Sequence, residues 1–268
     1  MNPDNPIGIF DSGIGGLTVA HAISKTLPNE KIIYFGDTEH LPYGNKSPKM
    51  ITFYSEKITD FLLKKKCKAI IIACNSASSI AFTALKRKTK NKCALFNVID
   101  PVIQSVVNDL FIKNLGVIGT NATIATNIYQ KNINKKRADI HVKSLATPLL
   151  ASLIEENNPQ LYKDNIIASY LDSKHMSNID SIILGCTHYP LIKSEIEHYY
   201  KGKIKIISTL KSIGKYVKNK LQKKNLLVLK KQIPKHNFYV SDYTKIFQEK
   251  TKLFFPSGII LEEENIFS

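Results

Sequence analysis

The chain has 268 residues, of which 43% are hydrophobic and 22% are charged, as is ordinary for a globular protein. The sequence does not open with a basic segment and a long apolar run, and apolar runs such as Ala69 to Ala73 are too short to span a bilayer. We therefore expect a cytoplasmic protein with no membrane partner. The net charge of +16 comes from lysines scattered along the chain without interleaved aromatic residues, so we expect no specific nucleic-acid partner.

Short β-branched runs alternate with helix-spaced segments along the first part of the chain. A continuous apolar run such as Ala69–Ala73 is typical of a buried parallel strand. Repeated β-α-β units predict a parallel sheet with helices on both faces. In chain order we expect a strand at Ile7–Phe10, a glycine-rich turn, a helix near Leu17–Thr26, a strand at Lys31–Phe35, a helix at Met50–Lys65 and a strand at Ala69–Ala73.

The same order returns further along the chain. Gly116 follows Gly8 by 108 positions, and Cys186 follows Cys74 by 112, so the two offsets indicate an internal repeat. We expect strands at Leu115–Gly119, Ile140–Lys143 and Ser181–Leu184, and helices near Ala122–Asn134, Leu149–Glu156 and Leu161–Lys174. After them we expect a helix near Leu191–Tyr200, a strand at Ile204–Ile207, a helix near Ile213–Gln222, a strand at Phe238–Val240 and a last helix at Tyr243–Lys250.

Polar clusters follow four of the predicted strands. They are Asp11-Ser12-Gly13, Asn75-Ser76, Gly119-Thr120-Asn121 and Thr187-His188. In open parallel sheets ligands bind outside the carboxyl ends of the strands, so these clusters predict the site. The glycine-rich turn at residues 11–16 lacks the spacing of a dinucleotide or P-loop motif, but its backbone N–H groups at a helix start favour a carboxylate.

Two of the four cysteines stand out by their context. Cys74 and Cys186 each end an apolar strand and precede small polar residues, where a helix N-terminus is expected to lower a thiol pKa from about 8.5. A single cysteine of this kind is more often a packing residue, but equivalent positions in two repeats favour chemistry. Cys67 and Cys93 lie among basic residues and are interpreted as structural.

His188 leaves several kinds of site open. It lies two residues after Cys186 and could orient or deprotonate that thiol, or bind a metal. A metal site built from Cys74, Cys186 and His188 lacks a visible fourth ligand, so we expect no metal. The absence of a G-x-S-x-G elbow disfavours a serine hydrolase. A Cys-His hydrolase stays open, although it leaves one cysteine unexplained.

Five segments together resemble one enzyme family. They read GIFDSGIGGLTV at Gly8–Val19, YFGD at Tyr34–Asp37, LPYG at Leu41–Gly44, ACNSAS at Ala73–Ser78 and LGCTHYPL at Leu184–Leu191. The chain resembles the glutamate racemases of the aspartate/glutamate racemase family through most of its length. Related aspartate and hydantoin racemases share the paired cysteines but not all of these segments.

This resemblance implies an α/β fold of two similar parallel-sheet domains with flanking helices. The two domains would be related by pseudo-two-fold symmetry, with the active site in the cleft between them. One domain would hold residues 1–98 plus 208–268, and the other residues 99–207. The resemblance also implies a homodimer.

The resemblance further implies racemisation of L- and D-glutamate without a cofactor, which supplies D-glutamate for peptidoglycan. Racemisation removes a proton from one face of Cα and adds one to the other, so two acid–base groups are needed. The implied pair is Cys74 and Cys186, with Asp11 assisting Cys74 and Glu155 with His188 assisting Cys186. The substrate glutamate would be held by Asp11, Ser12, Tyr43, Gly44, Asn75, Ser76, Thr187 and His188.

The sequence departs from the family pattern at three places. Ser76 stands where Thr is usual and keeps a hydroxyl, Thr147 stands where many members have Cys, and Ser208-Thr209 stands where an Asp is common. The last departure puts a family contact in doubt.

Two alternative functions stay open. One alternative is a racemase for aspartate or another acidic amino acid. The second is a non-enzymatic binding protein that keeps the fold.

Overall fold

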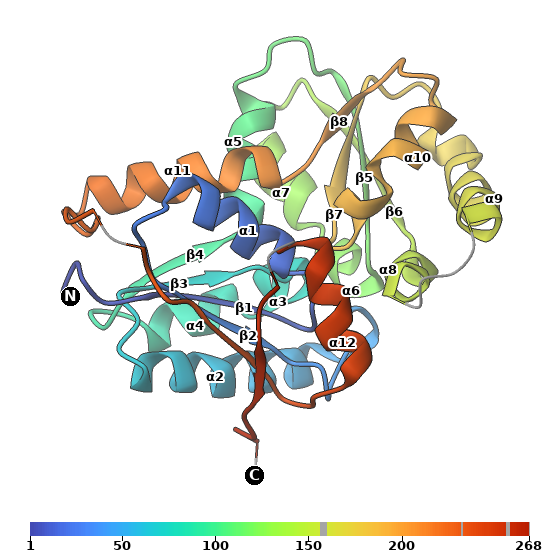
Figure 1. Ribbon diagram of the computed structural model, residues 1–268. Helices are drawn as coiled ribbons and strands as arrows, with labels where there is room; N and C mark the ends of the chain where they lie inside the picture. The colour runs from blue at the N-terminus through green and yellow to red at the C-terminus, as the bar shows by residue number, and fades with distance from the viewer. Residues whose placement is uncertain (156–159, 232, 256–257, 268) are drawn as a thin grey trace.

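The computed structural model describes residues 1–155, 160–231, 233–255 and 258–267, which form two parallel sheets flanked by helices (Figure 1). The first sheet has the strand order β10-β9-β2-β1-β3-β4 and the second has the order β6-β5-β7-β8. Every strand pair in both sheets is parallel. Among the described residues, no helix is long and apolar enough to cross a membrane. The predicted α/β fold of two parallel sheets with flanking helices is confirmed.

The strands of the first sheet come from two separate parts of the chain. They are β1 (Ile7–Asp11), β2 (Ile32–Gly36), β3 (Ala69–Ile72), β4 (Ala94–Asn97), β9 (Asn237–Val240) and β10 (Leu261–Glu263). The second sheet is built from one continuous stretch. Its strands are β5 (Asn114–Gly119), β6 (His141–Ala146), β7 (Ser181–Gly185) and β8 (Lys205–Ile207). The domain boundaries at residues 98 and 207 stay a prediction.

The internal repeat is visible in the strand order and register. The order β2-β1-β3-β4 corresponds to β6-β5-β7-β8, with β1 and β5 at matching places. Gly8 pairs with Ile70 in the first sheet, and Gly116 pairs with Ile182 in the second. Each of these isoleucines precedes a cysteine by four residues, so Cys74 and Cys186 occupy equivalent positions beyond β3 and β7.

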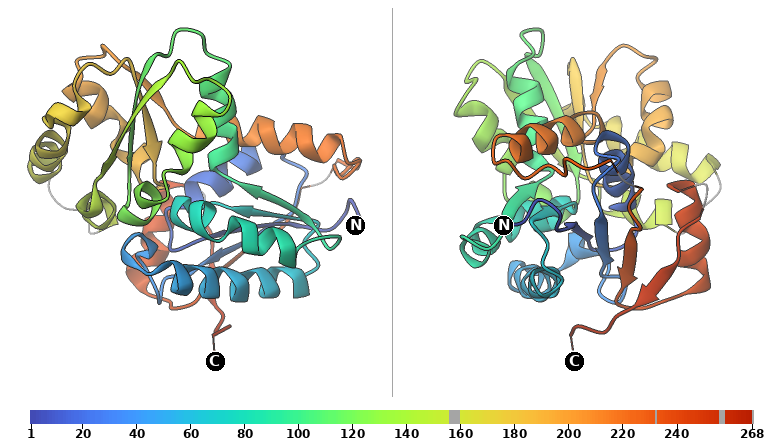
Figure 2. Two further views of the ribbon diagram at one scale, coloured as in Figure 1. Left: turned by 180° about the vertical axis from the view of Figure 1, so that it is seen from behind. Right: turned by 60° about the vertical axis from the view of Figure 1, so that its left-hand side comes forward.

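Helices cover both faces of each sheet and close four apolar clusters (Figure 2). On the first sheet, α1 (Leu17–Thr26) and α11 (Leu210–Gln222) pack on one face, and α2 (Pro48–Lys64), α3 (Asn75–Ile80) and α4 (Phe82–Lys88) on the other. On the second sheet, α5 (Ile99–Val107) and α7 (Ile128–Asn134) cover one face, and α8 (Pro148–Glu155), α9 (Gln160–Leu171) and α10 (Lys193–Tyr199) the other. The short helices α6 (Asn121–Ala125) and α12 (Lys245–Lys250) lie near the site.

Several helices differ from the sequence-based expectation. The helix expected at Ala122–Asn134 is two helices, because Asn127 adopts a left-handed φ of 53° between α6 and α7. The helix expected near Leu191–Tyr200 begins earlier, as a 3-10 turn at Tyr189–Ile192 that leads into α10. Elements α3, α4, β4, α5 and β10 were not expected. Of the helix expected at Leu149–Glu156, residue Glu156 lies outside the described residues.

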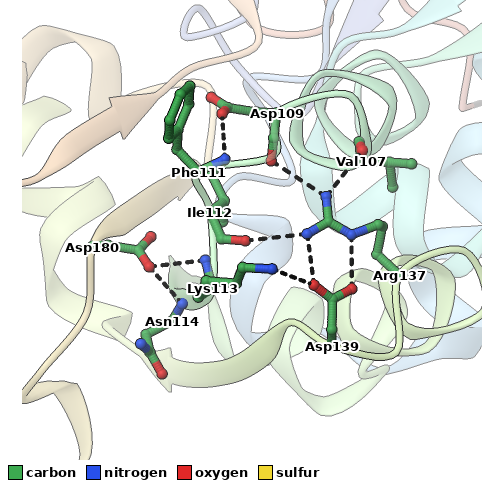
Figure 3. Close-up of polar contacts among 9 residues, drawn as sticks. All are labelled: Val107, Asp109, Phe111, Ile112, Lys113, Asn114, Arg137, Asp139 and Asp180. Carbon is green, nitrogen blue, oxygen red and sulfur yellow. Dashed lines mark hydrogen bonds and ion pairs between the residues drawn. The ribbon is translucent and has the colours of Figure 1, made fainter.

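The loop between α5 and β5 is fixed by Arg137 (Figure 3). Its guanidinium donates hydrogen bonds to the carbonyl oxygens of Val107, Asp109 and Ile112 at 3.3–3.5 Å. The same group forms a two-point ion pair with Asp139 at 2.7 and 2.8 Å. Arg137 therefore satisfies carbonyl groups that the end of α5 leaves without helical partners, a structural use for one of the chain's many cations.

Candidate active site

Cys74 links the end of β3 to the start of α3. It is the N-cap residue of α3, and its sulfur accepts a hydrogen bond from the Ala77 N–H at 3.5 Å. Its thiol also lies 3.7 Å from the Ser12 hydroxyl, which comes from the turn after β1. The Cys74 side chain is buried, so any proton that it exchanges must pass within a closed site.

The expectation of a lowered thiol pKa is wrong for Cys74. Burial is the largest effect, and together with the negative charge of Asp11 it raises the pKa of Cys74 to about 12. The hydrogen bonds of Cys74 with the Ala77 N–H and the Ser12 hydroxyl act in the opposite direction but are weaker. The thiol therefore carries its proton at neutral pH.

Cys186 ends β7 in the equivalent place but has different partners. Its sulfur lies 3.5 Å from Nδ1 of His188, and Nε2 of His188 lies 2.8 Å from a carboxylate oxygen of Glu155. The thiol and the imidazole are buried, and the Glu155 carboxylate is mostly so. The structure thus brings Cys186, His188 and Glu155 together in one hydrogen-bonded chain.

The charges in this chain follow from its geometry. Burial opposes a charge on His188, but the hydrogen bonds to Cys186 and Glu155 hold the pKa of His188 well above its ordinary value. Burial likewise opposes a charge on Glu155, yet His188 and Lys250 bring the pKa of Glu155 below its ordinary value. At neutral pH an imidazolium therefore lies between the sulfur of Cys186 and a carboxylate.

Asp11, at the end of β1, lies between the two cysteine environments. Its Oδ2 accepts hydrogen bonds from the Gly16 N–H at 2.6 Å and from the Thr187 hydroxyl at 3.4 Å. Its Oδ1 is buried and accepts no hydrogen bond from any residue in the described ranges. Burial raises the pKa of Asp11, and the charge on His188 opposes that rise. An unpaired buried carboxylate oxygen is suited to a cationic ligand group.

Three contacts between the segments that flank the first sheet and those that flank the second complete the site. The hydroxyl groups of Ser76 and Thr120 lie 2.9 Å apart, and the Asn75 amide donates to the Tyr129 hydroxyl at 2.8 Å. Gly44 packs against Thr120 so closely that a Cβ there would lie 2.7 Å from the Thr120 Cβ. Thr120 belongs to a polar cluster that the sequence indicated. Tyr129 was missed, since a tyrosine within a helix carries no such signal.

The Tyr43 side chain belongs to a hydrogen-bonded group around Asp37. It is buried, and its hydroxyl donates to Asp37 at 2.5 Å. The other oxygen of Asp37 lies 2.8 Å from His40 Nδ1. Asp37 therefore holds the segment around Gly44, and the Tyr43 hydroxyl is engaged within the protein.

A cavity of about 610 Å³ opens beside this segment. Its wall includes Gly44 and Asn45 from the first part of the chain and Asn121 from α6. The Asn121 amide donates to the Asn45 side-chain oxygen at 3.3 Å across it. The cavity therefore borders both the Gly44 segment and the turn that carries Thr120.

Of the three departures from the family pattern, Ser76 lies within the site, whereas Thr147 and the Ser208-Thr209 pair make their hydrogen bonds elsewhere in the protein. Thr209 is buried and its hydroxyl donates to the Val98 carbonyl at 3.4 Å, where the two connections between the sheets pass each other. Ser208 accepts a hydrogen bond from the N–H of Leu210. Thr147 shares a 2.7 Å hydrogen bond with the Tyr189 hydroxyl. Each of these side chains thus has a partner within the protein.

Known proteins are similar to this chain over most of its length. Residues 15–213 match the family model described as Asp/Glu/Hydantoin racemase. A glutamate racemase of Chlorobium phaeobacteroides is 38% identical over 258 residues, covering 96% of this chain and 94% of the relative. The crystal structure of glutamate racemase from Francisella tularensis in complex with D-glutamate has a TM-score of 0.91 at 36% identity, covering 99% of both chains.

A second solved structure, glutamate racemase isoform RacE1 from Bacillus anthracis, has a TM-score of 0.92 at 31% identity and covers 98% of both chains. The likeness therefore spans both sheets, and both strand ends that carry a cysteine. The chain belongs to the Asp/Glu/Hydantoin racemase family, and within that family to the glutamate racemases.

Proposed function

We propose that this amino-acid racemase interconverts L- and D-glutamate without a cofactor, with Cys74 and Cys186 as the two acid–base groups. The observation that carries the proposal is the placement of two buried thiols at equivalent ends of β3 and β7. They are near enough for a charge on Cys186 to contribute to the raised pKa of Cys74. The names of the similar proteins favour glutamate as substrate. We further propose that the D-glutamate supplies peptidoglycan synthesis.

In the proposed reaction, one cysteine thiolate takes the Cα proton, and the C–H bonding electrons remain on Cα and its carboxylate. The other cysteine gives its thiol proton to the opposite face of Cα, which inverts the centre. The two sulfurs thereby exchange protonation states. Turnover of the opposite enantiomer restores them, as does loss of a proton from one sulfur to water and gain of a proton from water by the other. Because no electron sink is attached to Cα, donors to the substrate carboxylate must lower the barrier.

The surroundings of the thiols support a division of labour in the resting enzyme. The His188 imidazolium, 3.5 Å from the sulfur of Cys186, can balance a thiolate there. Cys74 holds its proton, because burial and Asp11 raise its pKa. We infer that Cys186 starts as the base and Cys74 as the acid. The enantiomer with its Cα proton towards Cys186 is then the one that the resting enzyme accepts.

The substrate's charged groups find matching partners among the residues around the thiols. The free Oδ1 of Asp11 suits the ammonium group. Hydroxyl and amide groups suit the carboxylates, and we assign this role to Ser12, Asn75, Ser76 and Thr187, with the backbone of Tyr43 and Gly44. His188 would contact substrate from the Cys186 side.

The test is to follow each enantiomer of glutamate in heavy water with the wild-type protein and with Cys74→Ser and Cys186→Ser variants. We expect the wild type to place deuterium mainly in the inverted product. Each variant should racemise at least about 100-fold more slowly, since removal of a general acid or base typically costs that much. Near wild-type rates in either variant would refute the two-thiol mechanism. Added pyridoxal phosphate or a chelator should change nothing.

Substrate choice and assembly need separate measurements. Assays with L-aspartate and other acidic amino acids distinguish a glutamate enzyme from a relative with another substrate. We further propose a cytoplasmic homodimer, on family resemblance alone. Sedimentation equilibrium would test the dimer, and cell fractionation the location. An inactive protein with strongly salt-dependent DNA binding would instead support the binding-protein alternative.

A further inference from the structure

Lys250, at the end of α12, contacts the residue that holds the Cys186 side of the site. Its ammonium group donates a hydrogen bond to the backbone carbonyl of Glu155, the last residue of α8. In Figure 1, α12 stands beside α8, although 95 residues separate Lys250 from Glu155 in the sequence. A segment between strands β9 and β10 of the first sheet thus contacts a helix that covers the second sheet.

The segment that carries Lys250 is firmly attached to the first sheet. Gln248 donates to the Ile259 carbonyl at 2.5 Å and accepts from the Leu261 N–H at 2.9 Å, which ties α12 to β10. Thr251 and Phe254, directly after α12, are buried, and Phe254 belongs to the apolar cluster beneath α1. The position of Lys250 is therefore set by the first sheet.

Glu155 receives contacts from both sheets. Its carboxylate bonds His188 from the second sheet, and a Cβ on Gly13, in the turn after β1, would lie 3.2 Å from it. Lys250 places its positive charge against the backbone carbonyl of Glu155. The same charge contributes to the lowered pKa of the Glu155 carboxyl. Both effects hold Glu155 ionised and in place.

We propose that Lys250 is a positioning residue that couples the first sheet to the Glu155–His188 pair, and so to Cys186. The inference rests on the proposed function. Lys250 acts through Glu155 and His188, whereas the hydrogen-bond partners of Cys74 come from α3 and from the turn after β1. Its loss should therefore disturb the Cys186 side and leave the Cys74 side unchanged.

The expected effect of pH follows from the groups that face Glu155. These are His188 and Lys250, which favour its charge, and Asp11 and Tyr34, whose own pKa values its charge raises. Removal of Lys250 raises the pKa of Glu155. The carboxylate is then protonated at a higher pH, so the acid limb of the activity profile should move upwards.

The variants are Lys250→Met, Lys250→Arg and, as a matched control, Lys245→Met at an exposed position of the same helix. We expect Lys250→Met to lower kcat roughly tenfold with a smaller change in KM, since small misplacements of catalytic groups slow the chemistry strongly. The acid limb of the pH–activity profile of Lys250→Met should shift to higher pH. Lys250→Arg should recover most of the activity, and Lys245→Met should behave as wild type.

A second readout does not depend on racemisation. Iodoacetamide alkylation of Cys186 and Cys74, followed by mass spectrometry across pH, reports each thiol separately. We expect Lys250→Met to change the profile of Cys186 and not that of Cys74. The inference is overturned if Lys250→Met leaves both the alkylation of Cys186 and the pH profile of racemase activity unchanged. It is also overturned if Lys245→Met loses as much kcat as Lys250→Met. A wild-type protein that alkylates as expected but does not racemise glutamate refutes the proposed function alone.

Discussion

Gly15 lies directly against the imidazole of His188, so closely that a Cβ at Gly15 would be 2.6 Å from the ring nitrogen Nε2. Real side chains do not approach that closely, so the turn after β1 needs glycine at this position. The backbone of the first sheet's turn thereby forms one wall for the ring that lies between Cys186 and Glu155. The glycine-rich turn therefore allows the backbone to pack closely against His188, which the proposed reaction uses.

We predict that Gly15→Ala lowers racemase activity by roughly 100-fold, because the ring of His188 must shift from Cys186. Overpacking typically costs about 1–3 kcal/mol, so the variant should still fold. The matched control is Gly202→Ala. Gly202 has a φ of +67° with nothing near its Cβ position, so that variant should lose about 1 kcal/mol of stability and keep its activity. Steady-state kinetics and urea unfolding of both variants check the prediction, and full activity in Gly15→Ala would contradict it.

A buried ion pair lies at the opposite end of the first sheet from the site. Lys68 and Glu30 are 2.5 Å apart, with side chains 0% and 3% exposed. Lys68 also donates to the Pro3 carbonyl, and Glu30 accepts from the Val228 N–H at 3.0 Å. The pair thus joins the N-terminal segment, the start of β3 and the chain after α11.

We predict that Lys68→Met lowers the free energy of unfolding by about 3–5 kcal/mol, because it leaves the Glu30 charge buried without its partner. The control is Lys88→Met, which removes a half-exposed pair with Asp60 and should cost less than about 1 kcal/mol. Both variants should keep wild-type KM, since neither residue is near the thiols. Urea denaturation measures the difference, and equal costs in the two variants would show that burial of the pair is unimportant.

Because Cys67 is buried, its ionisation makes the free energy of unfolding depend on pH in the alkaline range. Burial, aided by Cys93, raises the pKa of Cys67 to about 12, against about 9 for an exposed thiol. In the unfolded chain the thiol ionises above pH 9, whereas the folded protein keeps the proton until about pH 12. The stabilising contribution is therefore complete below pH 9 and is lost progressively between pH 9 and 12.

We predict that the wild type loses about 1.4 kcal/mol more stability than Cys67→Ala between pH 7.5 and pH 10, one pH unit above the unfolded pKa. Titrating groups distant from Cys67 contribute equally to both proteins, so the comparison isolates Cys67 together with its effect on Cys93. Between pH 6 and 7.5 the two proteins should lose or gain stability equally. Parallel urea denaturation at the three pH values checks this, and equal alkaline losses would show that Cys67 does not keep its proton.

The strands and the place of the site were predictable, because buried parallel strands have a strong local signal. The run Ala69–Ala73 shows its apolar character without reference to the rest of the chain, and parallel strands bring their polar ends together. The helix Asn75–Ile80 was not predictable from periodicity, because it is built mostly from small residues around Cys74. Strand Leu261–Glu263 was missed because it is short and largely charged.

The electrostatics of the site were less accessible from local sequence. The position of Cys74 at a helix start predicted a lowered pKa, but burial in the apolar cluster between the first sheet and α2, together with the charge of Asp11 from another strand, outweighs that effect. The contact of Lys250 with Glu155 joins segments 95 residues apart and has no motif. Such long-range interactions depend on the tertiary packing of distant segments, which cannot be predicted from a short stretch of sequence.

The discontinuous first sheet has a consequence for the order of events on the ribosome. Residues 114–207, which supply every strand of the second sheet, are translated before β9 and β10, which complete the first. Domains fold as units during synthesis, so the second sheet can form while the first still lacks its edge. Lys250 is translated between β9 and β10 and reaches Glu155 only then. A nascent chain therefore contains both cysteines well before the contact between Lys250 and Glu155 can form.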